Sequence, residues 1–263
     1  MKLRIRFTKT GSMQYIGHLD LMRYFQKLFR RCGFDVAYSQ GFNPHQLMSF
    51  ASPLGLGVTT IADYLDVTLE SFVVTNSCGD EFVGKTLDID AWIDRINDYS
   101  NEMVKVTGIY VLDDAAKPSM SLLTACSYVI TGIPAETRKD IVKFFNENDK
   151  VVYMKETKKS VKEINLKEGI YIVANKYSEY CELADEITKR DVIYEKIMSE
   201  KEDGLYILCK SGSDNNIKPE MLLETYHNTI NPDKEYDKYA YDIERTDMYY
   251  GDKLCSMSMP FTS

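Results

Sequence analysis

Hydrophobic side chains recur at every second residue over residues 2–8 and at helical spacing over residues 18–32. The first stretch alternates strictly, so it predicts a half-buried strand whose polar face carries Arg4 and Arg6. The second stretch predicts an amphipathic helix, and Gly33 follows it at the position typical of a helix C-terminus. A strand followed directly by a helix limits the chain to fold classes that mix the two.

The predicted helix over residues 18–32 is strongly basic. Its polar face carries Arg23, Lys27, Arg30 and Arg31. Cations in the last turn suit the helix dipole, so part of this cluster has a purely structural explanation. The cluster as a whole predicts a surface that attracts anions.

The order of strand, helix and strand recurs as far as residue 112. We predict further strands over residues 34–39, 47–51, 64–70 and 104–112, and a helix over residues 88–101. This order matches a split βαβ unit of the ferredoxin-like kind, in which helices cover one face of an antiparallel sheet. Because the other face of such a sheet is open, we expect Arg4 and Arg6 to be exposed there, as in many nucleic-acid-binding modules.

The second half of the chain predicts the same topology without detectable sequence repetition. Residues 113–119 have the composition of a linker, and the lysine-rich residues 155–167 predict an exposed hairpin or loop. Strands are predicted to begin at residues 122, 151, 169 and 204, and helices at residues 134 and 219. Residues 176–200 give no clear pattern. We therefore expect an α+β protein of two tandem ferredoxin-like domains with antiparallel sheets, residues 1–115 and 116–263.

Residues 39–57 hold the densest set of shape-setting residues in the chain. These are Gly41, Pro44, Pro53, Gly55 and Gly57. Glycine allows positive φ or a close approach of the backbone, and proline stiffens a loop. Polar side chains such as Asn43 and His45 stand between them. A loop of this composition predicts a surface that holds a ligand or a partner.

Charge is distributed unevenly along the chain. The formal net charge is −8, yet residues 1–50 carry eight cations against Asp20 and Asp35, a net charge of +6. Phosphate binding depends on a local patch and not on the total charge. We therefore expect this region to bind RNA or another anionic ligand.

The predicted binding residues are Arg4, Arg6, His18, Arg23, Lys27, Arg30, Arg31, Phe42, Asn43 and His45. Three of them have alternative interpretations. His18, at the start of the helix, either caps or packs there or contacts an anion. His45 either contacts a ligand or forms hydrogen bonds within its own loop, and Phe42 either stacks on a base or belongs to the core.

No motif in the sequence indicates a particular reaction. The three histidines show no spacing that would gather them at a zinc ion, and no Ser-His-Asp or Cys-His order stands out. The six cysteines are scattered, with no CxxC pair, and we expect them to be small buried hydrophobes. Neither a dinucleotide-binding fingerprint nor a P-loop is present. We predict no catalytic residue, no metal-binding residue and no cofactor in this chain.

The cellular compartment follows from similar observations. The apolar runs are too short to cross a bilayer, and no signal-peptide pattern opens the sequence. We therefore expect a cytoplasmic protein with no membrane partner, whose cysteines form no disulfides.

Several motifs resemble those of one known family. Residues 9–23, 38–45, 48–55 and 63–66 are similar to the radical SAM-linked protein family of unknown function, and the likeness weakens over the second half. This family occurs as a stand-alone chain or as the C-terminal part of a larger radical SAM protein. The resemblance implies a radical SAM enzyme as a partner in trans. S-adenosylmethionine and an iron–sulfur cluster are then expected only in that partner, because this chain lacks a CxxxCxxC motif.

Three hypotheses about function remain open. In the first, the chain is an accessory module that binds RNA or another anionic substrate for the radical SAM enzyme. In the second, it is a protein-interaction adaptor without nucleic acid, docking through residues 39–57 with Phe42, Phe50 and Leu54 as anchors. In the third, it is a metal-independent ribonuclease-like enzyme that uses His18 or His45.

Overall fold

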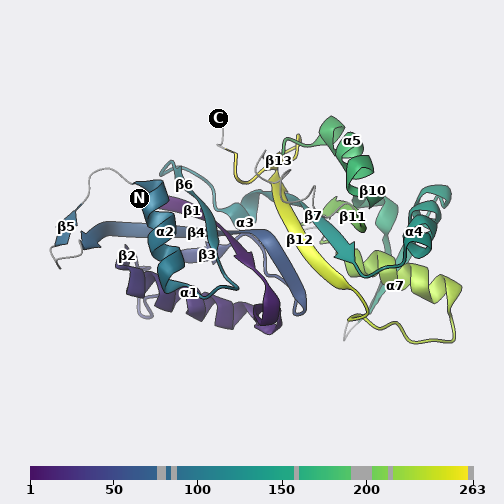
Figure 1. Cartoon of the computed structure of the whole chain (residues 1–263), viewed down its shortest axis with the longest axis horizontal. Coiled ribbons are helices and arrows are strands. Elements are labelled where there is room, and N and C mark those ends of the chain that lie inside the picture. Colours follow the sequence, from purple (N-terminus) through teal and green to yellow (C-terminus); the bar gives the residue numbers. More distant parts are fainter. Residues whose placement is uncertain (76–80, 84–87, 157–159, 191–202, 213–215, 260–263) are drawn as a thin grey trace. The chain divides into compact units, whose positions relative to one another are not determined.

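The computed structural model describes residues 1–75, 81–83, 88–156, 160–190, 203–212 and 216–259. The chain divides into two compact units, here called unit 1 (Met1–Leu122) and unit 2 (Leu123–Met259) (Figure 1). Each unit combines helices with mostly antiparallel strands, which confirms the predicted α+β class. The predicted domain boundary after residue 115 falls ahead of the short helix α3 (Ser119–Leu122) at the end of unit 1.

Strand β1 (Lys2–Lys9) confirms the strand predicted over residues 2–8, but it lies in the middle of the unit 1 sheet and is buried on both faces, not on one. It pairs antiparallel with β4 (Val58–Thr75) on one side and with β6 (Val106–Leu112) on the other. Three short strands pair with β4 as well: β2 (Phe34–Val36), β3 (Met48–Phe50) and β5 (Glu81–Val83).

Two helices cover one face of this sheet (Figure 1). Helix α1 (His18–Cys32) follows the 3-10 helix η1 (Gly11–Tyr15) and has the bounds that the sequence predicts. It ends at Gly33, whose φ of 82° places it in the left-handed region. Helix α2 (Ile89–Tyr99) begins after Asp88, whose side chain accepts a hydrogen bond from the Ala91 backbone.

The unit 1 core lies between these helices and the sheet. The apolar face of β1 meets the buried side chains of both helices, among them Phe25 and Trp92. The Trp92 ring stacks on Phe34 with a centroid distance of 4.2 Å. Burying one side chain of this size stabilises the fold by about 1.5–3 kcal/mol, so this layer supplies much of the stability of unit 1.

Unit 2 is built around β7 (Leu123–Thr131), which pairs antiparallel with β11 (Asp203–Lys210) and β12 (Asp242–Tyr250). Strand β10 (Ile170–Lys176) pairs with β11, and β13 (Cys255–Ser256) pairs with β12. The described residues of unit 2 include the helices α4 (Ala135–Glu147), α5 (Tyr177–Ile187) and α7 (Pro219–Ile230). Pro134 and Pro219 stand at the start of α4 and α7, as predicted.

A separate hairpin of β8 (Val152–Glu156) and β9 (Val161–Asn165) confirms the exposed element predicted over residues 155–167. The 3-10 helix η2 (Leu166–Glu168) connects it to β10. Helix α5 lies in the region for which the sequence gives no clear pattern. The remainder of that region, residues 191–202, lies outside the described residues.

The expectation that Arg4 and Arg6 are exposed on an open sheet face is wrong. Arg4 is completely buried and Arg6 is 2% exposed. The alternation of β1 is as predicted, but the chain crosses this face at the start of α3, where the Ser119 backbone N–H donates to the Asp66 carboxylate at 2.6 Å. The same carboxylate forms an ion pair with Arg4, and Arg6 lies opposite the fully buried Tyr64.

Candidate functional site

The glycine- and proline-rich loop follows β2, and hydrogen bonds hold its two ends together. Tyr38 and Gln46 form an isolated antiparallel bridge at its base. The Ser39 backbone N–H donates to the His45 carbonyl at 2.8 Å, which fixes the two sides of the loop against each other. Residues 39–45 therefore project from the unit on a hydrogen-bonded base, and we call them the projecting loop.

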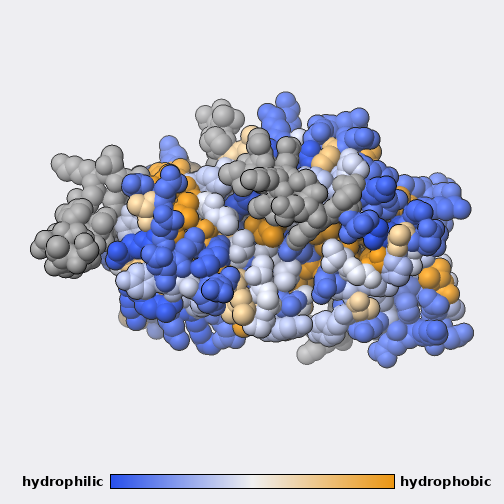
Figure 2. All heavy atoms as spheres, in the orientation of Figure 1, coloured by the Kyte–Doolittle hydropathy of each residue, from blue (hydrophilic) through white to orange (hydrophobic). Residues whose placement is uncertain are grey.

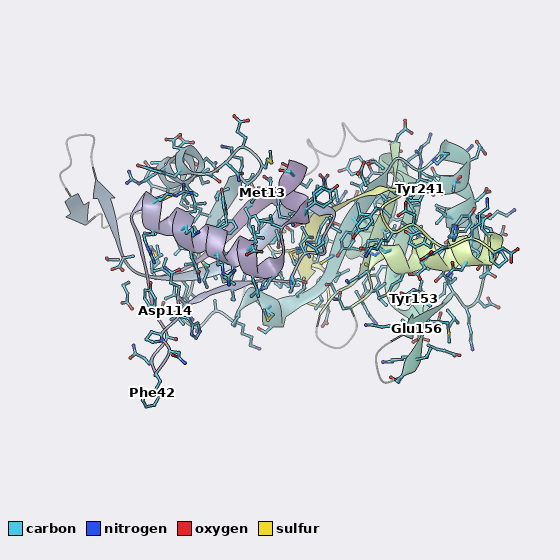
Figure 3. The ribbon with its side chains drawn as sticks, turned by 90° about the horizontal axis from the view of Figure 1, so that it is seen from below. Met13, Phe42, Asp114, Tyr153, Glu156 and Tyr241 are labelled. Atoms are coloured by element: carbon cyan, nitrogen blue, oxygen red, sulfur yellow. The ribbon has the colours of Figure 1, made fainter. Side chains whose placement is uncertain are left out.

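Phe42 lies at the tip of the projecting loop and is fully exposed (Figure 3). The backbone at Gly41 has a φ of 128°, a conformation that an L-residue rarely adopts, so the turn into the tip depends on glycine. Asn43 and Pro44 are exposed beside it. The interpretation of Phe42 as a core residue is thus wrong, and its ring is accessible to a base or to another protein.

His45 lies at the end of the projecting loop. The sequence left open whether it forms hydrogen bonds within the loop or contacts a ligand. Its Nδ1 lies 2.8 Å from the Ser39 hydroxyl, and its backbone N–H donates to the same oxygen at 3.1 Å. The exposed imidazole also lines a cavity at the base of the loop. Internal hydrogen bonding therefore holds the ring in place in a residue that also lines the cavity.

The cavity has a volume of about 340 Å³ and is built by unit 1 alone. Four separate stretches line it: the start of β1, the base of the projecting loop with β3, the middle of β4, and the segment after β6. Its charged and polar side chains include Lys2, His45, Gln46, Ser49, Asp66 and Lys117. A hollow of this size is at the lower end of the range for small-ligand sites.

Asp66 is the one carboxylate in the cavity lining, and its charge is already balanced. Arg4 donates to it through Nε at 2.8 Å and through Nη2 at 3.2 Å, so the two side chains form a bidentate ion pair. The remaining charges are the ammonium groups of Lys2 and Lys117. Lys2 also donates to the Asp114 carbonyl. The cavity therefore carries a net positive charge that favours an anion.

Gln46 adds a polar group of a different kind to the cavity wall. Its side-chain oxygen Oε1 is buried and, among the described residues, has no hydrogen-bond partner. A buried acceptor without a partner costs about 1–3 kcal/mol, which a donor would recover if the Gln46 side chain turned toward the cavity. The cavity thus combines cationic side chains with acceptors.

The four cations of α1 form an exposed stripe, here called the α1 stripe: Arg23, Lys27, Arg30 and Arg31. Arg23 pairs with Asp20 at 3.1 Å, and both side chains are well exposed. Within the described residues, the other three form no ion pair with a carboxylate. The surface over α1 is mostly hydrophilic (Figure 2). The structure therefore gathers these four predicted residues on one accessible helix face.

Helix α2 limits the extent of the basic surface. It packs beside α1, and its exposed positions Asp90, Asp94 and Asp98 repeat every fourth residue. The helical layer of unit 1 thus carries adjacent stripes of opposite charge. The cations of α1 attract an anion and the carboxylates of α2 repel it.

His18 begins α1, but Gly17 and not His18 occupies the N-cap position. The imidazole packs edge-on against Phe50, with a centroid distance of 5.3 Å and an interplanar angle of 67°. This contact agrees with the packing interpretation of His18. A role in anion contact stays a prediction.

Of the remaining loop-shaping residues, Gly57 has a positive φ of 82°, and its N–H donates to the Gln14 carbonyl at 3.0 Å. Gly55 shows neither a positive φ nor a close backbone approach, since a Cβ there would only touch Val58 at an ordinary 3.5 Å. Pro53 is exposed. Glycine is thus required by the backbone at two of the three positions predicted for it.

The sequence prediction missed the residues that form the cavity, above all Lys2, Gln46, Asp66 and Lys117. One signal was available for Asp66. Asp66 alternates with the apolar residues of β4. Because β4 pairs antiparallel with β1, Asp66 lies on the same sheet face as Arg4. No local signal pointed to Lys117, which reaches the cavity from the predicted linker.

Other chemistry-bearing groups give no further site. Among the described residues, no three His, Cys, Asp or Glu side chains gather as a metal site. Cys32, Cys126 and Cys209 are buried free thiols, and burial raises the pKa of Cys32 to about 11. Cys78 lies outside the described residues. No helix in the described part of the chain is long and apolar enough to cross a membrane.

The fold and the site define a mixed α+β protein with a basic helix, a projecting loop and a cationic cavity in its first unit. The chain belongs to a family described as uncharacterized proteins conserved in bacteria (DUF2344), whose model matches residues 2–219. No curated protein matches the chain. The family description names no activity, so the link to radical SAM enzymes stays a prediction.

Proposed function

We propose that this protein is an accessory module that binds RNA, or another anionic substrate, for a radical SAM enzyme acting in trans. The observation that carries the proposal is the α1 stripe, four exposed cations on one helix face. Arg23 and Arg31 are about 12 Å apart along an axis that rises about 1.5 Å per residue, enough to follow a phosphate backbone. Attraction to phosphates supplies most of the affinity of sequence-independent nucleic-acid binding.

The projecting loop adds a second element to this proposal. A fully exposed aromatic ring such as Phe42 suits stacking on an unpaired base, because every base offers a flat face. Single-stranded RNA is the form that offers such bases. The proposal therefore favours single-stranded or looped RNA over a regular duplex.

The fold that we propose for both units is ferredoxin-like, an arrangement that RNA-binding modules share. Support comes from strand order. It runs β6-β1-β4-β2 in unit 1 and β12-β7-β11-β10 in unit 2, with antiparallel neighbours throughout. Fold alone does not imply function, so this likeness supports the proposal only by analogy.

The partner in the proposal rests on the sequence resemblance over residues 9–23, 38–45, 48–55 and 63–66. In this arrangement the cluster and S-adenosylmethionine belong to the enzyme, and this chain positions the substrate. A cytoplasmic location is part of the same proposal.

The test is the salt dependence of RNA binding. We expect a single-stranded RNA, labelled for fluorescence anisotropy, to bind less tightly as salt rises, with a log–log slope of about −0.7 for each phosphate contacted. Replacing all four cations of the α1 stripe by Gln should reduce the slope by roughly 2–3. A matched variant neutralises four exposed lysines of unit 2, Lys139, Lys143, Lys234 and Lys253, and should keep most of the slope. A flat salt response of the wild-type protein would overturn the proposal.

A protein-interaction adaptor is the second candidate, and the exposed tip at Phe42 is the observation that favours it. Of its predicted anchors, Phe50 is wrong, since it is 2% exposed and packs against Phe7 and Phe25. Retention of an iron–sulfur protein from nuclease-treated lysate, lost in Phe42→Ala, would favour this candidate over RNA binding. Nothing in the described residues favours the ribonuclease hypothesis, because His18 packs on Phe50 and His45 bonds to Ser39.

A further inference from the structure

The cavity at the base of the projecting loop has features of a ligand site that the α1 stripe does not explain. It has a volume of about 340 Å³, and its lining comes from segments far apart in the sequence, from Lys2 to Pro118. Because four stretches of the sequence line this cavity, it forms only when unit 1 is folded. Its polar groups have distinct roles, which indicate the chemistry of a ligand.

Cations on this cavity are available for an anionic group. Arg4 neutralises Asp66 through two hydrogen bonds, so the charges of Lys2 and Lys117 are not balanced within the lining. The Lys2 ammonium has three donors and gives one to the Asp114 carbonyl. The others can reach a ligand oxygen. Lys117 is exposed, and Lys2 is half-buried.

Acceptors make up the second set of polar groups. An ionised carboxylate accepts hydrogen bonds and never donates them. At Asp66, Oδ2 accepts from Arg4 and from Ser119, whereas Oδ1 accepts one hydrogen bond, from the Arg4 Nε–H, among the described residues and keeps a lone pair. Gln46 also lines the cavity, and its Oε1 is shielded from solvent and lacks a donor among the described residues, so a turn of its side chain toward the cavity would bring it to a ligand donor. A ligand that satisfies both must present two N–H or O–H groups.

Apolar residues form a further part of the lining. Leu47, Leu112 and Pro118 contribute to the lining. A wall of this kind suits the face of a flat ring, since burying apolar surface adds to affinity without requiring hydrogen bonds. The ligand that matches all three features has an anionic group, a flat body and a donor edge.

We infer that this cavity binds one nucleotide, with the phosphate at Lys2 and Lys117 and the donor edge of the base at Asp66 and Gln46. Guanine is the base that fits, because its Watson–Crick edge presents two adjacent donors, N1–H and N2–H₂. Adenine, cytosine and uracil each lack two adjacent donors on that edge. If the nucleotide is part of an RNA, the inference rests on the proposed function. If it is a free nucleotide of the same chemistry, the inference is independent of that function.

The experiment is calorimetric titration of the full chain with GMP, AMP, CMP and UMP, and with guanosine and inorganic phosphate. We expect GMP to bind about tenfold or more tightly than the other three nucleotides, since an unmatched edge leaves a buried acceptor unsatisfied. Loss of the phosphate or of the base should each weaken binding. Binding should shift the backbone amide resonances of Leu47 and Ser49, because these residues line the cavity.

Two sets of variants locate the site. Lys2→Gln with Lys117→Gln should weaken GMP binding about tenfold, as expected when charged hydrogen bonds to an anion are lost. Lys27→Gln with Arg30→Gln removes the same charge from the α1 stripe and should leave GMP affinity unchanged. Asp66→Asn should abolish the preference for GMP. Because that change also affects Arg4, the lysine variants keep the test valid if it does not fold.

The outcomes separate this inference from the proposed function. Salt-dependent RNA binding without measurable GMP binding overturns the nucleotide site and leaves the proposed function standing. Equal affinity for all four nucleotides overturns the selection of guanine. Tight GMP binding without RNA binding supports the cavity as a free-nucleotide site and overturns the proposed function. An RNA ending in an unpaired guanosine that competes with GMP supports both.

Discussion

Strand β1 and helix α1 both carry arginines with apolar neighbours at the expected period, and the fold uses these arginines in opposite ways. Arg4 on β1 is completely buried against Asp66, whereas Arg30 on α1 is exposed. Arg4 contributes no charge to the surface. Because it neutralises Asp66, the net charge of the cavity comes from Lys2 and Lys117. The comparison teaches that a cation is available to an anionic ligand only where the fold leaves it without an internal partner.

The largest expected effect breaks this comparison at Arg4. Arg4→Met leaves the largely buried Asp66 carboxylate, whose side chain is 14% exposed, without its counter-ion and should destabilise unit 1 by about 3 kcal/mol. Arg30→Gln, an exposed change, should alter stability by less than about 0.5 kcal/mol. Urea unfolding followed by tryptophan fluorescence measures both, because the single tryptophan, Trp92, is buried in unit 1.

The double variant Arg4→Met with Asp66→Leu is the control for that measurement. Removing both charges avoids an unpaired buried ion, so the double variant should be more stable than Arg4→Met alone. Equal unfolding midpoints for Arg4→Met and Arg30→Gln would show that the two arginines do not differ in the way that the structure describes.

The same contrast explains which parts of the fold could be predicted from the sequence. The bounds of α1 were correct because they follow from local signals, an apolar period ending at Gly33. The burial of Arg4 depends on Asp66 and on Ser119, residues distant in the sequence, which no periodicity reports. Helix α5 was missed because its buried face consists largely of tyrosines and because it follows β10 directly, without a turn residue.

The candidate site likewise has one part that local sequence signals predict and one part that they do not. The projecting loop was predictable from its glycine and proline content, since these residues act on the backbone where they stand. The cavity was not, because its lining joins the N-terminus, β3, β4 and the predicted linker. Only Asp66 could have been inferred from the sequence. Its place in the alternation of β4 puts it on the same sheet face as Arg4 when the two strands pair.

The next expected effect concerns the tip of the projecting loop, which is exposed like the α1 stripe but uncharged. Phe42→Ala should weaken single-stranded RNA binding by roughly tenfold, in the range for loss of one stacked base, without changing the slope of affinity against salt. Anisotropy titrations at several salt concentrations measure both quantities. Tyr239→Ala, an exposed aromatic residue of unit 2, is the control and should have no effect. A changed slope with unchanged affinity would contradict stacking by Phe42.

A smaller effect compares two glycines of the same loop region. Gly41→Ala places a Cβ on a backbone with a φ of 128° and should destabilise the projecting loop by about 1–3 kcal/mol. Gly55→Ala meets only ordinary contacts at an unstrained φ and should be near neutral. Hydrogen exchange of the Ser39 amide, which bonds to the His45 carbonyl at the loop base, reads out local opening. Equal exchange in both variants would show that the turn at Gly41 does not depend on glycine.

The smallest expected effect separates the two faces of α1 by pH. Burial raises the pKa of the Cys32 thiol from about 9 to about 11, while the neighbouring Arg31 is exposed on the other face. The unfolded chain therefore loses this proton at a lower pH than the folded chain, and stability should fall as pH rises above about 9. Between pH 8 and pH 10 the fall attributable to Cys32 should be roughly 1 kcal/mol. In Cys32→Ala this part of the pH dependence should vanish, whereas in Arg31→Gln it should persist, because removing a nearby cation raises the thiol pKa further. Parallel pH profiles for wild type and Cys32→Ala in urea unfolding would mean that the inner face of α1 is not closed to water at its last turn.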